Sequence, residues 1–224
     1  MDFHRFRIEN AYRNNTTLFI YYGMRILVAV AAVLFLVRGD WESAGITAFV
    51  ALLMSIPSFV KSRYRIFLPF AIDFSMVAFI FLSLFLGGVD NFYGHIPLWD
   101  KILHFQSGLL LSGTGFVVIY LLSQSEKTRI ELSPGFIALF AVVFSLAIGA
   151  TWEIAEFTGD AIFGSTWQNG LPDTMWDLIA DGGGALVFSV GGYFWMYRHK
   201  RLPFTPLFIK FIERAKKVAK QVGK

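Results

Sequence analysis

The stretch TWEIAEFTGDAIFGSTWQNGLPDTMWDLIAD, residues 151–181, joins two apolar segments and sets six carboxylates along them. In each segment three acidic residues recur every three or four positions, which places them on one face of a helix. They are Glu153, Glu156 and Asp160 in the first segment and Asp173, Asp177 and Asp181 in the second. A charge at the centre of a bilayer costs about 3 kcal/mol, so such residues usually face the bundle interior and mark a functional site.

The composition is that of a membrane protein. Of the 224 residues, 55% are hydrophobic, only 16% are charged and 25 are Phe, and the mean hydropathy is +0.56. The sequence contains no Cys, which excludes disulfides, thiolate metal sites and Cys nucleophiles. Any metal ion would therefore be held by oxygen atoms and His.

Six apolar runs have about the 20 residues that a helix needs to cross a bilayer. They cover approximately residues 17–37, 43–60, 66–87, 102–122, 136–157 and 175–197. We therefore predict an all-α, polytopic membrane protein with six transmembrane helices.

The distribution of Lys and Arg predicts the orientation of these helices. Basic residues concentrate in the N-terminal segment, in the second and fourth loops and in the C-terminal tail, whereas the first, third and fifth loops hold only Arg38 and Lys101. Because cytoplasmic loops carry the excess of basic residues, we expect both termini to be cytoplasmic. The expected location is the cytoplasmic (plasma) membrane.

The C-terminal tail is the most basic part of the chain. Nine of the 20 Lys and Arg residues lie between Arg198 and Lys224. Apolar and basic positions alternate with helical period there, which is typical of an amphipathic helix lying on anionic inner-leaflet lipids. We predict a transmembrane domain over 1–203 and a cytoplasmic tail helix over 204–224. No nucleic-acid recognition motif accompanies the basic residues, so nucleic acid is not an expected partner.

The predicted orientation gathers the acidic residues on the outer side of the membrane. Two further polar residues, Asp100 and His104, begin the fourth predicted helix at the same level, one turn apart. Several carboxylates with one His suit a divalent cation such as Zn²⁺, Mg²⁺, Mn²⁺ or Ca²⁺. The predicted metal ligands are His104, Glu156, Asp177 and Asp181, with Glu153 as a ligand or catalytic base and Asp100 as a hydrogen-bond partner of His104.

Other polar residues receive structural interpretations. Asp160 and Asp173 lie nearest the helix ends, where a carboxylate can form a solvated rim or a helix cap. Arg25 and Asp73 enter the first and third predicted helices to similar depths from the inner side. Because buried charges in membranes are usually paired, we predict a structural ion pair between them, with a role in transport as the alternative.

Three segments resemble a known family in their order and spacing. WDKILHFQSGLLLSGTGF, WEIAEFTGD and DTMWDLIADGGGALV resemble the YjdF-type family of multi-spanning bacterial membrane proteins. The chain is more distantly similar to VanZ-like proteins, which are associated with glycopeptide-antibiotic tolerance at the cell envelope. The positions that carry the second similarity are Asp100, Lys101, His104, Phe105, Glu153 or Glu156, Asp177, Asp181 and Gly184. The chain has more carboxylates than the VanZ-like pattern.

These observations lead to a functional hypothesis with two alternatives. The first is a metal-dependent hydrolysis or transfer reaction on an envelope lipid or a phosphate-bearing substrate, at a site open to the outer face. The same carboxylates could instead bind the cation of a small cation- or proton-coupled transporter. The third interpretation is a structural metal site in a non-enzymatic envelope accessory protein. The sequence leaves the choice between enzyme and non-enzyme open.

Overall fold

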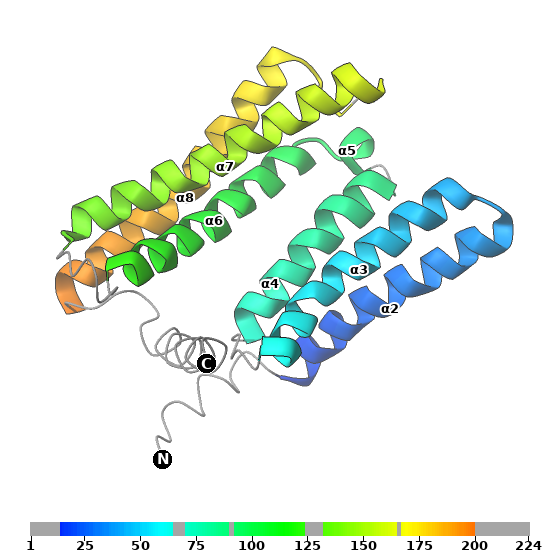
Figure 1. Cartoon of the computed structure of the whole chain (residues 1–224), viewed down its shortest axis with the longest axis horizontal. Helices are drawn as coiled ribbons and strands as arrows, with labels where there is room; N and C mark the ends of the chain where they lie inside the picture. Colours follow the sequence, from blue (N-terminus) through cyan, green and yellow to red (C-terminus); the bar gives the residue numbers. More distant parts are fainter. Residues whose placement is uncertain (1–13, 65–69, 90–91, 124–131, 165–166, 200–224) are drawn as a thin grey trace, which may run out of the picture. The chain divides into compact units, whose positions relative to one another are not determined.

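The computed structural model describes residues 14–64, 70–89, 92–123, 132–164 and 167–199, and within these ranges every regular element is helical (Figure 1). The chain divides into two compact units at Pro97 and Leu98. The all-α prediction is confirmed for the described residues. The predicted tail helix over 204–224 and many of the basic residues that set the predicted orientation lie outside them.

The first unit begins with a hairpin of two long helices, α2 (Asn15–Arg38) and α3 (Trp41–Tyr64). The side chain of Asn14 caps α2 by accepting a hydrogen bond from the backbone of Thr17 at 2.8 Å. Gly39 ends α2 in the left-handed conformation, with φ of 75°, where glycine has no steric penalty. Asp40 then accepts the backbone N–H of Ser43 at 3.1 Å and so begins α3.

The third span of this unit has two parts. It comprises α4 (Phe70–Ile80) and the π-helical stretch η1 (Phe81–Val89), and a short helix, α5 (Phe92–His95), follows. Apolar side chains from α2, α3, α4 and η1 meet between the helices to form the core of the unit. They are Tyr21, Val28, Val50, Met54, Val77, Phe81 and Phe85.

The predicted pair between Arg25 and Asp73 is wrong. Asp73, only 1% exposed, forms its ion pair with Lys61 and accepts a 3.0 Å hydrogen bond from the hydroxyl of Tyr21. Arg25 instead donates to the Met54 carbonyl at 2.7 Å and to Ser58 at 3.1 Å, and its guanidinium lies 4.6 Å from the Tyr21 ring centroid. The flexible stem of a lysine at the end of α3 reaches the buried carboxylate, which a comparison of helix depths could not reveal.

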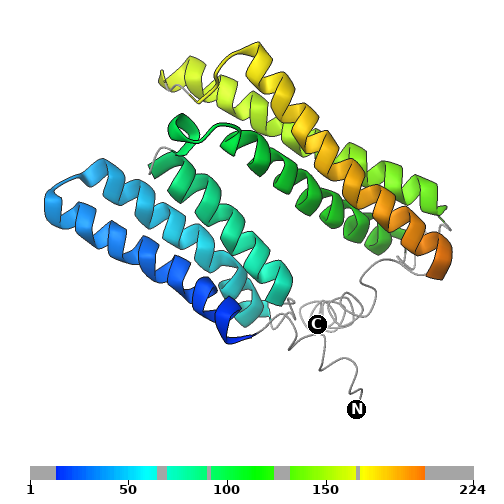
Figure 2. The ribbon, with the colours of Figure 1, turned by 180° about the vertical axis from the view of Figure 1, so that it is seen from behind.

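The second unit is a bundle of three long helices, α6 (Trp99–Ser123), α7 (Pro134–Phe163) and α8 (Leu171–His199). Each packs against the other two, and both views show them side by side (Figure 1, Figure 2). Ser133 caps α7 and Pro134 occupies its first turn, while Gly164 ends it with φ of 67°. The start of α6, the end of α7 and the start of α8 therefore meet at one end of the bundle.

Glycines allow α6 and α8 to approach until their backbones touch. A Cβ atom on Gly108 would lie 2.2 Å from the Asp181 carbonyl oxygen, and one on Gly184 would lie 2.0 Å from that of Phe105. Further along the same interface the hydroxyls of Ser112 and Ser189 are 2.8 Å apart. Small residues at a helix contact are the usual means of close packing in membranes.

Five helical segments are long and apolar enough to cross a membrane: Asn15–Arg38, Trp41–Arg63, Phe70–Val89, Trp99–Ile119 and Pro134–Phe163. The sixth predicted span is helical over Leu171–His199 but does not reach the same hydropathy. Three Asp residues and several glycines lower the hydropathy of α8. The predicted six-helix membrane architecture thus agrees with the structure, with α8 as its polar member.

The helix contact at Gly184 generates a stability prediction. Gly184→Ala should lower the free energy of unfolding in mixed detergent micelles by about 1–3 kcal/mol, because the added methyl group must push two backbones apart. Gly191→Ala, on the same helix, is the matched control, since a Cβ there meets no atom within 4 Å. The control should stay within about 0.5 kcal/mol of the parent protein. Equal losses in the two variants would contradict the close contact.

Candidate functional site

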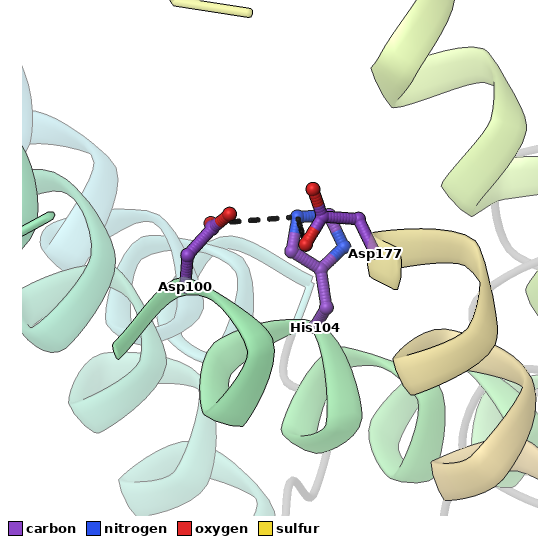
Figure 3. A group of neighbouring side chains, drawn as sticks. All are labelled: Asp100, His104 and Asp177. Atoms are coloured by element: carbon purple, nitrogen blue, oxygen red, sulfur yellow. Dashed lines mark ion pairs between the residues drawn. The ribbon is translucent and has the colours of Figure 1, made fainter. Parts of the chain in front are cut away.

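Polar side chains from all three helices of the second unit gather where the helix ends meet. Figure 3 shows Asp100 and His104 on α6 facing Asp177 on α8. One ligand atom from each of these three residues lies within 4.8 Å of the other two. The structure therefore brings the acidic residues of α8 and the polar start of α6 together, in agreement with the prediction that they lie at the same level of the membrane.

The imidazole of His104 is the centre of this group. Its Nε2 atom is 3.7 Å from three carboxylate oxygens, which belong to Asp100, Glu153 and Asp177. This distance is too long for a hydrogen bond. Ligands bound 2.0–2.2 Å from a tetrahedral zinc ion lie roughly 3.3–3.6 Å apart, so each oxygen is about as far from Nε2 as two ligands of one small cation are from each other. Of the three residues, Asp100 and Asp177 also lie close enough to each other to form one ligand group with His104.

The other nitrogen of His104 fixes the orientation of the ring. Nδ1 lies 3.2 Å from Oδ2 of Asp181, and the other carboxylate oxygen, Oδ1, accepts a hydrogen bond from the hydroxyl of Ser107. A Cβ atom at Gly149 would lie 2.3 Å from Asp181 Oδ2, so the glycine leaves the space that this carboxylate fills. With its proton on Nδ1 and bonded to Asp181, the ring carries on Nε2 the lone pair that can bind a metal ion.

Glu153 has an oxygen atom without a hydrogen bond. Its side chain is only 5% exposed, and among the described residues Oε1 has no hydrogen-bond partner. This is the same atom that lies 3.7 Å from His104 Nε2. Because a buried polar atom left unpaired costs about 1–3 kcal/mol, the atom is suited to a ligand between Glu153 and His104.

Lys101 supplies the positive charge of the cluster. Its ammonium contacts three carboxylates: Asp177 at 2.7 Å, Asp100 at 3.0 Å, and Asp173. Asp177 is only 3% exposed, so this pairing stabilises a carboxylate that is otherwise withdrawn from solvent. The sequence pattern predicted no role for Lys101 at the site. The feature that could have indicated one is that Lys101 is the single basic residue in the loops beside the acidic stripes.

Two of the predicted rim residues stabilise the loop that joins α7 to α8. Asp160 accepts the backbone N–H groups of Trp167 and Gln168, both at 2.9 Å. Asp173 lies in the first turn of α8 rather than at its cap, and accepts from the side chain of Asn169 at 3.2 Å as well as from Lys101. Burial acts to raise the pKa of Asp173, but these hydrogen bonds outweigh it and the pKa falls below its ordinary value.

The remaining predicted residues occupy different parts of the site. Glu156, predicted as a metal ligand, accepts a 2.9 Å hydrogen bond from the Trp152 indole and is not in the group around His104 Nε2. Asp100, predicted as a partner of His104, is in that group, and Asp181 bonds the opposite nitrogen. Ser107 and Gly149 were not predicted to contact Asp181, because helical periodicity does not reveal which turns of two helices touch.

The chain belongs to the family described as "Predicted membrane protein (DUF2238)", whose model matches residues 19–198. An uncharacterised protein of Thermotoga maritima is 38% identical over 130 residues, which are 53% of this chain and 64% of that relative. The chain therefore spans less than two thirds of the relative's length. No solved structure matches the chain. Neither match carries the YjdF-type name or supports the VanZ-like similarity, so both resemblances remain predictions.

The hydrogen bonds of Asp173 generate a pH-dependent prediction. Because the folded-state pKa is depressed, the ionised carboxylate stabilises the fold above its ordinary pKa of about 3.9, and this stability is lost as the pH falls through the folded value. Asp173→Asn should therefore reduce the free energy of unfolding by about 1 kcal/mol at pH 7. The difference between variant and parent should shrink below pH of about 3.9.

Glu42→Gln, at an exposed carboxylate in the first turn of α3, is the control for this measurement. Substitutions at exposed positions usually change stability by less than about 0.5 kcal/mol, so the variant should unfold like the parent protein at both pH values. An Asp173→Asn difference that is the same at neutral and acid pH would show that the charge of Asp173 contributes nothing.

Proposed function

We propose that this member of the DUF2238 family is a membrane metalloprotein that binds one divalent cation between His104 and the carboxylates of Asp100 and Asp177, with Glu153 beside the ion. The observation that carries the proposal is that one ligand atom from each of Asp100, His104 and Asp177 lies within 4.8 Å of the other two. The buried, unpaired Oε1 of Glu153 lies 3.7 Å from His104 Nε2 and supports the proposal. A water molecule bound to the ion would give this oxygen a hydrogen-bond partner.

The donor set favours a particular class of metal. One imidazole with two carboxylates suits Zn²⁺ or Mn²⁺ better than Mg²⁺ or Ca²⁺, which prefer oxygen ligands alone. Asp181 supports the assignment because metal-bound histidines usually donate their second nitrogen to a carboxylate or carbonyl. In this arrangement Asp181 orients the ligand His104 and is not itself a ligand.

We further propose that the metal acts as a Lewis acid for hydrolysis or transfer on an envelope lipid or a phosphate-bearing substrate. The positive-inside rule supports an outward-facing site, because Arg198 and His199 end α8 at the opposite side of the second unit. Asp100, at 32%, is the most exposed carboxylate around His104, so a substrate would enter beside it. We propose the cytoplasmic membrane as the location.

Metal analysis of the purified full-length chain tests the proposal. After removal of metal with a chelator, titration with Zn²⁺ or Mn²⁺ should reveal one tight site per chain. His104→Ala and Asp177→Asn should each weaken binding at least tenfold, since even the partners of metal ligands contribute 10–100-fold. Glu42→Gln, at an exposed carboxylate in the first turn of α3, should bind like the parent protein.

Glu156→Gln distinguishes the ligand set of the structure from that of the sequence. A small effect is expected because Glu156 bonds Trp152, whereas a loss equal to that of Asp177→Asn would favour the sequence-based set. Absence of any tight site in the parent protein, or metal binding unchanged in His104→Ala and Asp177→Asn, would refute the proposal.

Transport is a second candidate, and one observation favours it. Three fully or almost fully buried serines, Ser145, Ser112 and Ser189, lie within the second unit beyond the acidic cluster. Their hydroxyls bond one another or the carbonyls of Gly108 and Ala185, as helix-packing serines do. A hydroxyl series of this kind could also pass protons.

Proton-flux measurements in liposomes separate the two roles of these serines. If they only pack helices, the parent protein and Ser112→Ala should give the same flux as liposomes without protein. A flux in the parent protein that falls at least tenfold in Ser112→Ala, with Thr114→Ala as the exposed control on the same helix, would favour transport instead.

A further inference from the structure

We propose that the ammonium of Lys101 occupies the second cation position of a two-cation carboxylate centre, and thereby restricts the site to a single metal ion. The inference rests on the proposed metal at His104 and specifies how many ions the site binds. It makes Lys101 the residue that determines metal stoichiometry, and assigns Asp173 to the position of Lys101 rather than to that of the metal.

The contacts of Lys101 define this second position. Nζ is bonded to carboxylate oxygens of Asp100, Asp173 and Asp177 and to no neutral acceptor among the described residues. Three carboxylates around one cation are the oxygen ligands that hard divalent ions prefer. The ammonium is a compact charge with three donors, so it can substitute for an ion in such a group.

Two of the three carboxylates also belong to the position beside His104. Asp100 directs Oδ1 toward His104 Nε2 and Oδ2 toward Lys101. Asp177 offers the same atom, Oδ1, to both, 3.7 Å from Nε2 and 2.7 Å from Nζ. Carboxylates shared in this way are typical of binuclear centres, in which two ions lie about 3.5–4 Å apart.

The remaining ligands separate the two positions. Glu153 and His104 face only the first position, with their unbonded atoms 3.7 Å apart. Asp173 contacts Lys101 and Asn169 and none of the first group. The two positions therefore share Asp100 and Asp177 and differ in their other donors, so each can be altered independently.

Charge explains why the second position holds a lysine rather than an ion. Five carboxylates, from Asp100, Glu153, Asp173, Asp177 and Asp181, surround Lys101 and His104, the two basic groups of the cluster. A tethered ammonium neutralises part of this charge whether or not metal is present, and so stabilises the helix ends before any ion binds. A second divalent ion would have to displace it from Asp177 Oδ1 against the attraction of three carboxylates.

Metal stoichiometry in three lysine variants tests the inference. The purified full-length chain is loaded with Mn²⁺ or Zn²⁺, freed of excess ion, and analysed for metal per chain. We expect one ion in the parent protein and in Lys101→Arg, which keeps the charge, but two in Lys101→Met, which keeps the aliphatic stem. Lys61→Met, which removes the lysine paired with Asp73 in the first unit, should still bind one ion.

The outcomes distinguish this inference from the proposed function. No ion in either the parent protein or Lys101→Met would refute both. One ion in each would overturn the inference alone, as would two ions in the parent protein. One ion in the parent protein and none in a folded Lys101→Met would also overturn it, because Lys101 would then only hold the ligands in place.

Asp173→Asn keeps the inference testable if Lys101→Met does not fold. The substitution should leave one ion bound with an affinity within twofold of the parent protein, because Asp173 belongs to the second position. A tenfold loss of affinity in Asp173→Asn would overturn the division into two positions. If Lys101→Met does fold, adding Asp173→Asn to it should reduce the number of bound ions from two to one.

Discussion

The close backbone contact between α6 and α8 brings the polar side chains of these two helices together. Because Gly108 and Gly184 carry no side chains, Asp181 on α8 can reach His104 and Ser107 on α6. Gly149 on α7 leaves room for the same carboxylate. A larger residue at Gly108 or Gly184 would separate the helices, and one at Gly149 would displace the Asp181 carboxylate, so the glycines are as much a part of the site as the acids.

Once His104 is oriented, the charge of the surrounding residues becomes the dominant physical constraint. Carboxylates that are withdrawn from solvent repel one another unless cations or protons neutralise them. Lys101 neutralises part of the negative charge of Asp177, Asp100 and Asp173, but it makes no contact with Glu153. The unpaired oxygen of Glu153 is thus the part of the cluster that the protein's own groups leave unsatisfied. The proposed cation would supply positive charge beside this oxygen.

Hydrophobic run length predicted the helices well, because crossing a bilayer imposes a length and a composition that few other structures share. Periodicity also predicted that α6, α7 and α8 would each contribute acidic or His residues to one level. It failed for Glu156, because the face that a helix presents depends on its partners. It failed for Lys101 and Lys61 because a long side chain reaches across a turn of helix, so Cα positions do not determine its partner.

Each of the two units contains a buried Asp that forms an ion pair with a lysine, but the balance of charge around the two pairs differs. Asp73 and Asp177 are almost equally buried, and each is bonded to a lysine near a helix end. Around Asp73 the basic groups Lys61 and Arg25 outnumber the single acid, so its charge is balanced without a further cation, although Asp73 Oδ1 and Arg25 Nε have no hydrogen-bond partner among the described residues. This network is best explained as a structural element. Around Asp177 the acids outnumber the bases. Local charge balance, rather than burial, therefore distinguishes an intramembrane carboxylate that joins helices from one suited to bind an ion.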